Sequence, residues 1–344
     1  MKACVLHNIG DLRYEDATMP EPQSGEVLLH VRASGICGSD IQRVFEKGTY
    51  NFPTIPGHEF SGEVVEAADP ADKWLVGKKA AVFPLLPCRK CASCEIGEYA
   101  QCKDYDYYGS RRDGGFAEYL CVRVSNLVLV PDEVSFEEAA MCEPAAVAIH
   151  ALSQAGVNFG DTAAIFGAGT IGIMLAKIAR AWGAARVLLI DIDGAKLEFA
   201  NRLGFEHTVN STQTDAVEAV MAITGGKGCN VTVEGTGVSP ALVQCMKVSA
   251  TFGRVVLMGN PAGDMALSQK AYWEILRKQL TLKGTWNSSF NATHNDWEKA
   301  VAAMPRLDLR ELITHRYGFS RCNEAFEMIK SRGEFAVKVM FINE

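Results

Sequence analysis

Four cysteines lie close together in one short stretch of the chain. Their spacing is Cys88-x2-Cys91-x2-Cys94-x7-Cys102. Four thiolates on a short loop suit tetrahedral Zn²⁺ with no open coordination position, which is a structural site. An iron–sulfur cluster is the alternative, although bacterial ferredoxins place about three residues before the last cysteine, where this chain has seven. Four free surface thiols are a poor interpretation because clustered exposed thiols oxidise.

Three further segments carry residue types that ligate metals. They are Cys37 in GICGSD, His58 and Glu59 in PGHEF, and Glu143 in CEP. Considered singly, each has an ordinary explanation: a core thiol, a hydrogen-bonded turn histidine, and surface carboxylates. The pair His58-Glu59 does not begin a zincin motif, because Gly62 stands where the second histidine would be. Spacing alone therefore leaves these residues as candidates only.

A glycine-rich segment has the spacing of a dinucleotide-binding loop. Gly167-Ala-Gly169-Thr170-Ile171-Gly172 fits G-x-G-x-x-G, follows an apolar strand and opens an apolar helix. The glycines allow a tight turn, a close approach to a pyrophosphate and close helix packing, while the helix N-terminus attracts the phosphates. Asp191, 19 residues after Gly172, can accept both ribose hydroxyls and would repel a 2′-phosphate. This pattern predicts NAD rather than NADP; the alternative is a packing-driven glycine turn with a capping aspartate.

The elements that must position these residues differ between the two parts of the chain. Short β-type runs separated by Gly and Pro predict an irregular antiparallel barrel at first; they cover 26–32, 62–66 and 116–122. A long apolar helix over 138–154, interrupted by Pro144, follows. Apolar strands then alternate with helices, which predicts a parallel sheet covered on both faces; the strands are 162–166, 186–190, 230–234 and 254–258, and the helices 171–182 and 195–203. Beyond Trp286, with a helix over 294–304, the chain either rejoins the first domain or stands as a tail.

Length and composition exclude several classes of protein. At roughly 150 residues per domain, the 344 residues predict about two domains. Contents of 48% hydrophobic and 22% charged residues exclude a disordered chain. A net charge of −7 without a basic tail argues against nucleic-acid binding. Neither a secretory signal nor a membrane span is visible, so we expect a cytoplasmic protein. Eleven cysteines, an odd number, favour metal binding over a disulfide framework.

Together, these signatures resemble the zinc-dependent medium-chain alcohol dehydrogenase family over essentially the whole chain. They occur in family order: G-I-C-G-S-D (35–40), G-H-E-x-x-G (57–62), the four cysteines, the glycine loop and the acidic residue at 191. Segments 84–88, 109–119 and 142–144 most resemble the polyol branch. The resemblance implies an α/β fold. A GroES-like, β-rich catalytic domain is expected from 1–147 and 287–344, and a Rossmann domain with a doubly wound parallel sheet from 148–286.

The resemblance also implies a catalytic Zn²⁺ besides the structural one. Cys37 and His58 match two of its ligands, and a carboxylate supplies the third. Glu143 matches the ligand position of polyol-phosphate enzymes, whereas Glu59 matches the ligand of sorbitol-type enzymes. Exchange between the two carboxylates as the metal shifts is a hypothesis that anomalous density at zinc would test.

A proton relay is implied as well. Ser39 matches the family hydroxyl that passes the substrate proton through the cofactor ribose. Many alcohol dehydrogenases end this relay with a histidine, but this chain has Gln42 there, which cannot carry a proton. The exit of the relay is therefore open between water, the ribose hydroxyl and Glu59.

The implied reaction is reversible, zinc- and NAD-dependent oxidation of a secondary alcohol on a sugar alcohol phosphate. Arg111 and Arg112 suit such a substrate because guanidiniums bind phosphate bidentately. A surface arginine pair that packs against or caps its loop is the alternative. Tyr50 and Trp286-Asn287 match segments that line the substrate cleft of relatives, although core packing explains Trp286 equally well.

Other functions compete with this one. Free polyols such as sorbitol, 2,3-butanediol and L-threonine are the alternative substrates, and a zinc-free quinone reductase would lack the ligands seen here. A catalytically silent structural protein of the same fold would have a damaged ligand set, yet all four candidate ligands are present. No basic patch supports a DNA-binding regulator. A homodimer or homotetramer is expected, since relatives pair edge strands; the candidate strands are 255–258 and 280–284.

Overall fold

The computed structural model describes residues 1–343, which form two compact units. One unit contains residues 1–146 and the chain from Ser289 onward, and the other contains Val147–Ser288. The sequence-based domain boundaries lie within two residues of these limits. Each unit has its own sheet and its own buried core, so each is described by itself.

The unit 147–288 is built on a six-stranded parallel sheet of order β12-β11-β10-β13-β14-β15. Its strands are β10 (Thr162–Phe166), β11 (Arg186–Asp191), β12 (His207–Asn210), β13 (Cys229–Glu234), β14 (Ser249–Leu257) and β15 (Thr281–Gly284). The chain reverses its direction across the sheet at β10, which is the switch point where such folds bind ligands. Central strands are buried on both faces, which explains why they are apolar runs rather than alternating patterns.

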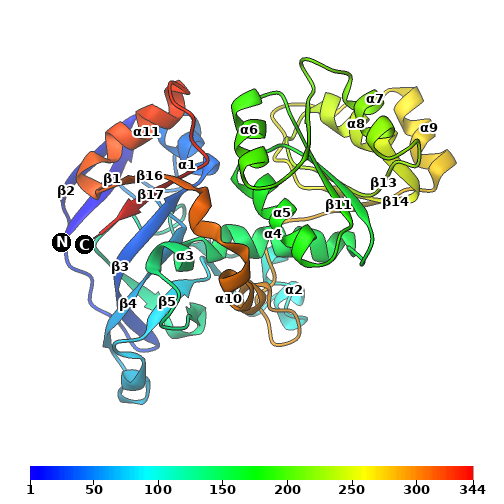
Figure 1. Ribbon diagram of the computed structural model, residues 1–344. Helices are drawn as coiled ribbons and strands as arrows, with labels where there is room; N and C mark the ends of the chain where they lie inside the picture. The colour runs from blue at the N-terminus through cyan, green and yellow to red at the C-terminus, as the bar shows by residue number, and fades with distance from the viewer. Residues whose placement is uncertain (344) are drawn as a thin grey trace. The chain divides into compact units, whose positions relative to one another are not determined.

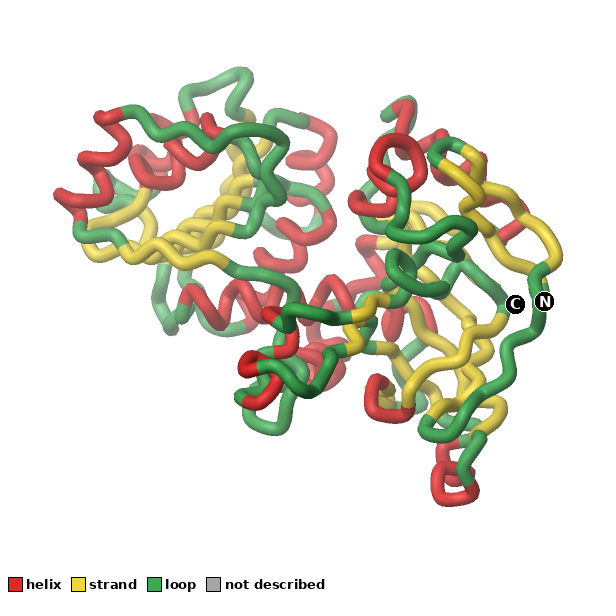
Figure 2. The backbone as a smooth tube through the Cα atoms, turned by 180° about the vertical axis from the view of Figure 1, so that it is seen from behind, coloured by secondary structure: helices red, strands yellow, loops and turns green. Residues whose placement is uncertain are grey.

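Helices cover both faces of this sheet, as Figure 2 shows around the yellow strands of the unit. They are α5 (Thr170–Ala181), α6 (Gly194–Arg202), α7 (Ala216–Ile223), α8 (Ser239–Val248) and α9 (Gln269–Lys278). Two starts are fixed by aspartates, because Asp193 and Asp215 each accept two backbone N–H groups of the following turn. The predicted doubly wound α/β domain is thus confirmed.

The other unit contains a seven-stranded sheet of order β16-β17-β3-β4-β5-β9, with β8 pairing on β3. Its strands are β3 (Glu26–Ile36), β4 (Glu59–Ala67), β5 (Lys79–Val82), β8 (Tyr119–Arg123), β9 (Leu127–Leu129), β16 (Ile313–Tyr317) and β17 (Lys338–Ile342). The last strand runs antiparallel to β3, with Val339 opposite Ile36. Figure 1 shows the red β17 beside the blue β3. The C-terminal segment therefore rejoins the first domain.

Smaller elements complete this unit. The further strands are β1 (Lys2–Asn8), β2 (Asp11–Asp16), β6 (Leu85–Leu86) and β7 (Asp106–Tyr107). The helices are α1 (Gly38–Gln42), α2 (Ala92–Glu95), α3 (Phe136–Ala140), α4 (Cys142–Ala155, which runs into the second unit), α10 (Asp296–Leu307) and α11 (Cys322–Ser331). Short 3-10 or π-helical turns are η1 (Arg43–Lys47), η2 (Pro70–Leu75), η3 (Tyr99–Gln101), η4 (Val124–Asn126), η5 (Leu309–Leu312) and η6 (Phe319–Arg321). Phe116 packs edge-on against Phe326 and Phe341 in its buried core.

Two expectations about local structure are wrong. The helix predicted over 138–154 is two helices that break at Met141, because α3 ends at Ala140 and α4 begins at Cys142. Pro144 lies in the first turn of α4, where the absence of its N–H leaves no hydrogen bond unmade. Trp286 is 58% exposed, which excludes core packing for it. Within the part of the chain described, no helix is both long and apolar enough to cross a bilayer.

Candidate active site and metal centres

The four cysteines of the predicted structural site converge. Sγ of Cys91 lies 3.6 Å from Sγ of Cys94 and 3.9 Å from Sγ of Cys102, and Sγ of Cys88 lies 4.0 Å from that of Cys94. Sulfurs bound about 2.3 Å from one tetrahedral Zn²⁺ would be about 3.8 Å apart. The thiols of this cysteine lobe (88–102) therefore already have the spacing that zinc requires, with no place for a fifth ligand.

The backbone of the cysteine lobe explains this convergence. Arg89 and Gly97 have φ of 56° and 80°, which turn the chain sharply between the ligands. Backbone hydrogen bonds from Lys103 and Cys94 lower the pKa of Cys91 to about 6. Burial, in contrast, raises the pKa of Cys94 to about 12. The Cys91 thiolate is thus favoured before a metal binds, whereas Cys94 needs the metal to deprotonate it.

A second group of potential ligands meets where β3 and β4 pair. Ligand atoms of Cys37, His58 and Glu59 all lie within 4.8 Å of one another. Cys37 directly follows β3, and Glu59 opens β4 opposite Gly35 in the antiparallel ladder. A Cβ at Gly35 would lie 2.4 Å from Oε2 of Glu59, so only glycine allows this approach. The strand pairing therefore joins ligands that the sequence keeps apart.

Asp40, a buried residue of α1, holds this group in place. Its Oδ2 accepts the N–H of Cys37 at 3.0 Å, and its Oδ1 lies 3.3 Å from Nδ1 of His58 and 2.7 Å from Nη1 of Arg43. Burial raises the pKa of Asp40, but His58, Arg43 and the Cys37 N–H outweigh it and hold the pKa at about 2. A carboxylate on Nδ1 leaves Nε2 of His58 for a metal, the usual arrangement of a ligating histidine.

The two candidate carboxylate ligands have different surroundings. Glu59 is 2% exposed, and its Oε2 accepts a hydrogen bond of 2.5 Å from Nζ of Lys338, which also donates to the carbonyl of Ile36 at 3.1 Å. Glu143, in the first turn of α4, is also buried. Burial and the charge of Glu59 raise the pKa of Glu143 to about 7, against the opposing effects of His58 and Lys338.

The donors of this buried group suit a divalent cation. Three buried carboxylates, on Asp40, Glu59 and Glu143, face the cations Arg43 and Lys338. They also face His58: burial lowers the pKa of this imidazole, but the Asp40 carboxylate outweighs burial and raises the pKa well above its usual value. A metal ion that replaces the imidazole proton would keep positive charge beside these carboxylates. The donor set of one thiolate, one imidazole and carboxylate oxygen is one that Zn²⁺ accepts with an open position.

The glycine loop of the other unit has the geometry of a phosphate cradle. Gly167 has φ of 104°, and a Cβ on Gly172 would lie 1.8 Å from the carbonyl oxygen of Gly167. Gly169 precedes α5, which begins with Thr170 and Ile171, and brings no side chain to the helix N-terminus. A Cβ there would meet nothing within 4 Å, so the space in front of the loop is open. These features fit a bound pyrophosphate.

Asp191 lies at the carboxyl end of β11, as predicted from the spacing. Its Oδ2 accepts the N–H of Ala168 at 2.6 Å, and its Oδ1 accepts the N–H of Asp193 at 2.9 Å. These bonds fix the carboxylate against the glycine loop. A carboxylate has about four acceptor positions, so each oxygen can still accept a ribose hydroxyl.

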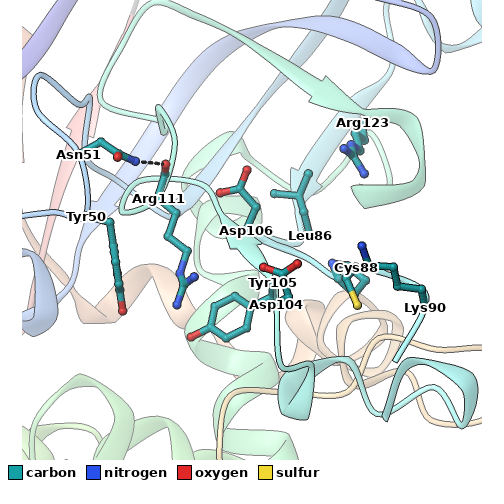
Figure 3. A pocket seen from close by; sticks show the side chains of 11 residues that line it. Tyr50, Asn51, Leu86, Cys88, Lys90, Asp104, Tyr105, Asp106, Arg111 and Arg123 are labelled. Atoms are coloured by element: carbon teal, nitrogen blue, oxygen red, sulfur yellow. Dashed lines mark hydrogen bonds between the residues drawn. The ribbon is translucent and has the colours of Figure 1, made fainter. Parts of the chain in front are cut away.

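The residues predicted to contact substrate lie in different surroundings. Nε of Arg112 donates to Oδ2 of Asp106 at 2.7 Å. The Arg111 guanidinium instead lies between the rings of Tyr50 and Tyr105, at the edge of a hollow of about 500 Å³ (Figure 3). Asn287 belongs to the other unit, has φ of 58° and turns its Oδ1 to the N–H of Ser288.

Two parts of the chain match the models of known protein families. The family model described as an alcohol dehydrogenase GroES-like domain matches residues 23–132, and that described as a zinc-binding dehydrogenase matches residues 170–306. The chain belongs to the zinc-binding alcohol dehydrogenase family. This dehydrogenase is thus an oxidoreductase of small molecules, and the predicted GroES-like and Rossmann domains are confirmed.

Three curated relatives of the dehydrogenase differ in substrate. Galactitol 1-phosphate 5-dehydrogenase of Escherichia coli K12 is 34% identical over 99% of this chain and 100% of its own. Sorbitol dehydrogenase of Bacillus subtilis is 30% identical over 99% of this chain and 96% of its own. L-threonine 3-dehydrogenase of Rhizobium johnstonii is 33% identical, with 92% and 91% covered.

Solved structures of other dehydrogenases are similar to this chain over its whole length. The crystal structure of galactitol-1-phosphate dehydrogenase from E. coli matches with a TM-score of 0.93 and 34% identity, covering both chains fully. A zinc-binding dehydrogenase of Sinorhizobium meliloti bound to NADP matches with a TM-score of 0.90 and 27% identity, and the match covers 99% of each chain. A dehydrogenase of E. coli CFT073 complexed with NADH matches with a TM-score of 0.91 and 25% identity, and the match covers 100% of this chain and 99% of that one.

Sequence reasoning missed three residues of the dehydrogenase that support the ligand group. Asp40 follows Cys37 by three positions, the offset at which an acidic side chain reaches back to a helix start, so a local signal existed. Arg43 lies one helical turn further and donates to both Asp40 and Oγ of Ser39, the latter at 3.0 Å. Lys338 is 279 residues from Glu59, and no spacing rule links them.

The buried pair of Lys338 and Glu59 should contribute strongly to stability. Replacing Lys338 by Met keeps most of the side-chain volume but leaves the carboxylate buried without its partner. We expect K338M to lower the free energy of unfolding by about 3–5 kcal/mol. The double variant K338M/E59M should recover most of this loss, since apolar side chains of similar size replace buried ion pairs well.

Denaturant unfolding of the zinc-loaded protein measures this effect. The matched control is Lys2→Met, which breaks an exposed pair with Asp16 at 2.9 Å and should change the free energy of unfolding little, because water screens this pair. A K338M cost as small as that of the control would show that Glu59 finds another partner.

Proposed function

We propose that this dehydrogenase reversibly oxidises a secondary alcohol of a polyol phosphate to the ketone, with NAD as hydride acceptor. The observation that carries the reaction is the meeting of Cys37, His58 and Glu59, whose ligand atoms lie within 4.8 Å of one another, beside the buried Glu143. The full-length similarity to a galactitol 1-phosphate enzyme supports the substrate class.

Cys37 and His58 would hold the catalytic Zn²⁺, with Glu59 or Glu143 as the third ligand. Zinc bound there supplies a Lewis acid that favours the ionised form of an alcohol at neutral pH. Asp40 orients His58 through Nδ1, and Arg43 fixes Asp40 in turn. Lys338 holds Oε2 of Glu59 through a short hydrogen bond, which leaves Oε1 of that carboxylate for a metal. Glu143 is the alternative third ligand.

Ser39 is the residue we assign to receive the substrate proton. Its Oγ accepts a hydrogen bond from Arg43 at 3.0 Å, which leaves its own hydrogen for a second partner. Gln42 turns its Oε1 to Nζ of Lys47 at 3.1 Å and cannot extend the relay. With Gln42 excluded, Ser39 would pass the substrate proton on to water, to the ribose hydroxyl of a bound NAD or to Glu59.

NAD is the proposed cofactor because of the fixed Asp191 carboxylate. A 2′-phosphate would be held against this negative charge. The next helix start offers no compensation, because Nζ of Lys196 lies 4.0 Å from Oδ2 of Asp193 and is shared with that acid. The two nucleotide-bound relatives carry NADP in one case and NADH in the other, so the choice depends on the residues of this chain.

The assembly we propose is a homodimer or homotetramer through the edge strand β15. Thr281–Gly284 ends the six-stranded sheet, and most of its residues are exposed. Unpaired backbone groups on such an edge favour pairing with a second copy. The other candidate segment, 255–258, is not an edge, because β14 pairs with β13 on one side and β15 on the other.

An activity panel tests the proposed function. NADH formation is followed with galactitol 1-phosphate, galactitol, sorbitol, 2,3-butanediol and L-threonine, each with NAD and with NADP, before and after chelation. We expect chelator-sensitive turnover on the phosphorylated polyol, at least about tenfold faster with NAD. Turnover of a free polyol, the diol or L-threonine alone would make that compound the substrate in place of the polyol phosphate. If the zinc-loaded enzyme turned over none of these compounds, the polyol assignment would be wrong.

A further inference from the structure

Two adjacent arginines of the β7–β8 connection have opposite surroundings. Arg112 has a carboxylate partner, because its Nε donates to Asp106 at 2.7 Å, and its guanidinium lies 5.6 Å from the ring of Tyr108. Arg111 has no carboxylate partner among the described residues, and its Nε is buried without any hydrogen-bond acceptor. A buried donor without an acceptor is destabilising, so its persistence needs an explanation.

The Arg111 side chain is nevertheless held in place. Its guanidinium carbon lies 4.3 Å from the ring centre of Tyr50 and 4.4 Å from that of Tyr105. Its carbonyl oxygen accepts a hydrogen bond from Nδ2 of Asn51 at 3.0 Å. Figure 3 shows the side chain extending between the two rings. With both faces covered, a partner can reach the guanidinium only in its plane, which is the direction of its N–H fork.

Charged side chains of both signs line the hollow beside Arg111. Lys90 and Arg123 are joined there by Asp104, Asp106 and Cys88, one of the four cysteines of the lobe. Asp106 is already paired with Arg112, and the cations Lys90 and Arg123 stand against Asp104 and the thiolate of a metal-bound Cys88. The in-plane fork of Arg111 is then the group of this hollow that suits an oxyanion better than a neutral hydroxyl.

Aromatic rings connect this hollow to the ligand group in the same unit. The ring of His58 lies 5.9 Å from that of Tyr107, and Tyr107 lies 6.2 Å from Tyr105, which stacks on Arg111. One continuous set of side chains therefore extends from the proposed catalytic metal to the guanidinium. A substrate with its reacting alcohol at one end and an anion at the other would match this arrangement.

We propose that Arg111, clamped between Tyr50 and Tyr105, is the phosphate-binding and specificity-determining residue of the substrate site, while Arg112 is structural. This proposal rests on the proposed function for the substrate, but its anion site can be tested independently. A carboxylate on the substrate could bind the guanidinium in the same way as a phosphate. The experiment below distinguishes a phosphate from a carboxylate.

The test compares R111Q and R111K with the wild-type holoenzyme. The matched control is Arg321→Gln, another arginine of this unit that stacks on a tyrosine, with its guanidinium carbon 4.8 Å from the ring of Tyr317, and pairs with Glu324 outside the hollow. We expect R111Q to raise the KM for galactitol 1-phosphate about 10- to 100-fold, with kcat and the KM for galactitol changed less than about threefold. R111K should recover only part of the loss, because an ammonium lacks the fork. R321Q should match the wild type.

Binding of inorganic phosphate, followed by calorimetry, provides the independent arm. Phosphate binding that R111Q abolishes, without turnover of any phosphorylated polyol, would support the anion site and overturn the proposed substrate. Turnover of galactitol 1-phosphate that R111Q does not change would overturn the anion site and leave the proposed function intact. An R111Q effect on the KM for L-threonine, with phosphate not bound, would overturn the phosphate class in favour of a carboxylate.

Discussion

Replacing His58 by Ala should reduce kcat/KM at least about 1000-fold and lower the zinc content from two ions per chain to one. The imidazole is one of the two ligands that no neighbour can replace, since Asp40 is committed to Nδ1 of His58 and to Arg43. A loss of about 4 kcal/mol in transition-state stabilisation corresponds to this factor, and Lewis-acid stabilisation by a metal contributes several kcal/mol. Metal analysis and steady-state kinetics on the same preparation measure both quantities.

The control for this variant is His294→Ala. His294 is exposed and has no metal-ligating neighbours among the described residues, so its loss should leave two zinc ions and normal turnover. If H58A retained two zinc ions and activity within about tenfold of the wild type, Cys37 and His58 would not hold the catalytic metal. If H58A lost both ions, the two metal centres would be coupled through folding, and the effect on rate would not be specific to catalysis.

How far the sequence predicts the site depends on how local each part is. The ligands of the cysteine lobe are within 14 residues of one another, so their spacing alone predicts a common metal. The glycine loop and Asp191 are predictable for a similar reason, because one strand–helix–strand unit contains them all. Their signals combine residue type with the period of a known local structure.

The proposed catalytic group depends on long-range pairing, which spacing does not encode. Cys37 meets Glu59 only because β3 and β4 pair in a register that places Gly35 opposite Glu59, and Lys338 arrives on the last strand. The resemblance to a family supplied these ligands, but not Lys338. The sequence also does not distinguish Arg111 from Arg112. That distinction depends on which guanidinium Asp106 reaches, and this is a property of the folded loop.

Replacing Cys94 by Ser should remove the other zinc ion and disorder the cysteine lobe. Few apolar side chains are buried in the lobe; among its residues Ile96 is 74% exposed. The metal must therefore supply most of its order. Structural zinc contributes apparent binding free energies of about 10–16 kcal/mol in small zinc peptides, as much as the stability of a whole domain. We expect amide exchange in 88–102 to accelerate at least about 100-fold, with one zinc ion retained per chain.

The same variant should weaken substrate binding more than catalysis. Lys90 belongs to the lobe and Tyr105 follows it closely, and both line the hollow beside Arg111. Without the metal, Tyr105 loses the position from which it covers one face of the Arg111 guanidinium, so KM for a phosphorylated polyol should rise while the catalytic zinc remains. Cys121→Ser, a half-buried thiol on β8 outside the lobe, is the matched control and should keep both ions. Unchanged exchange in C94S would mean that the lobe is ordered by its contact with the rest of the unit, such as the hydrogen bond of 3.0 Å from Asn291 to the carbonyl of Gly97, rather than by the metal.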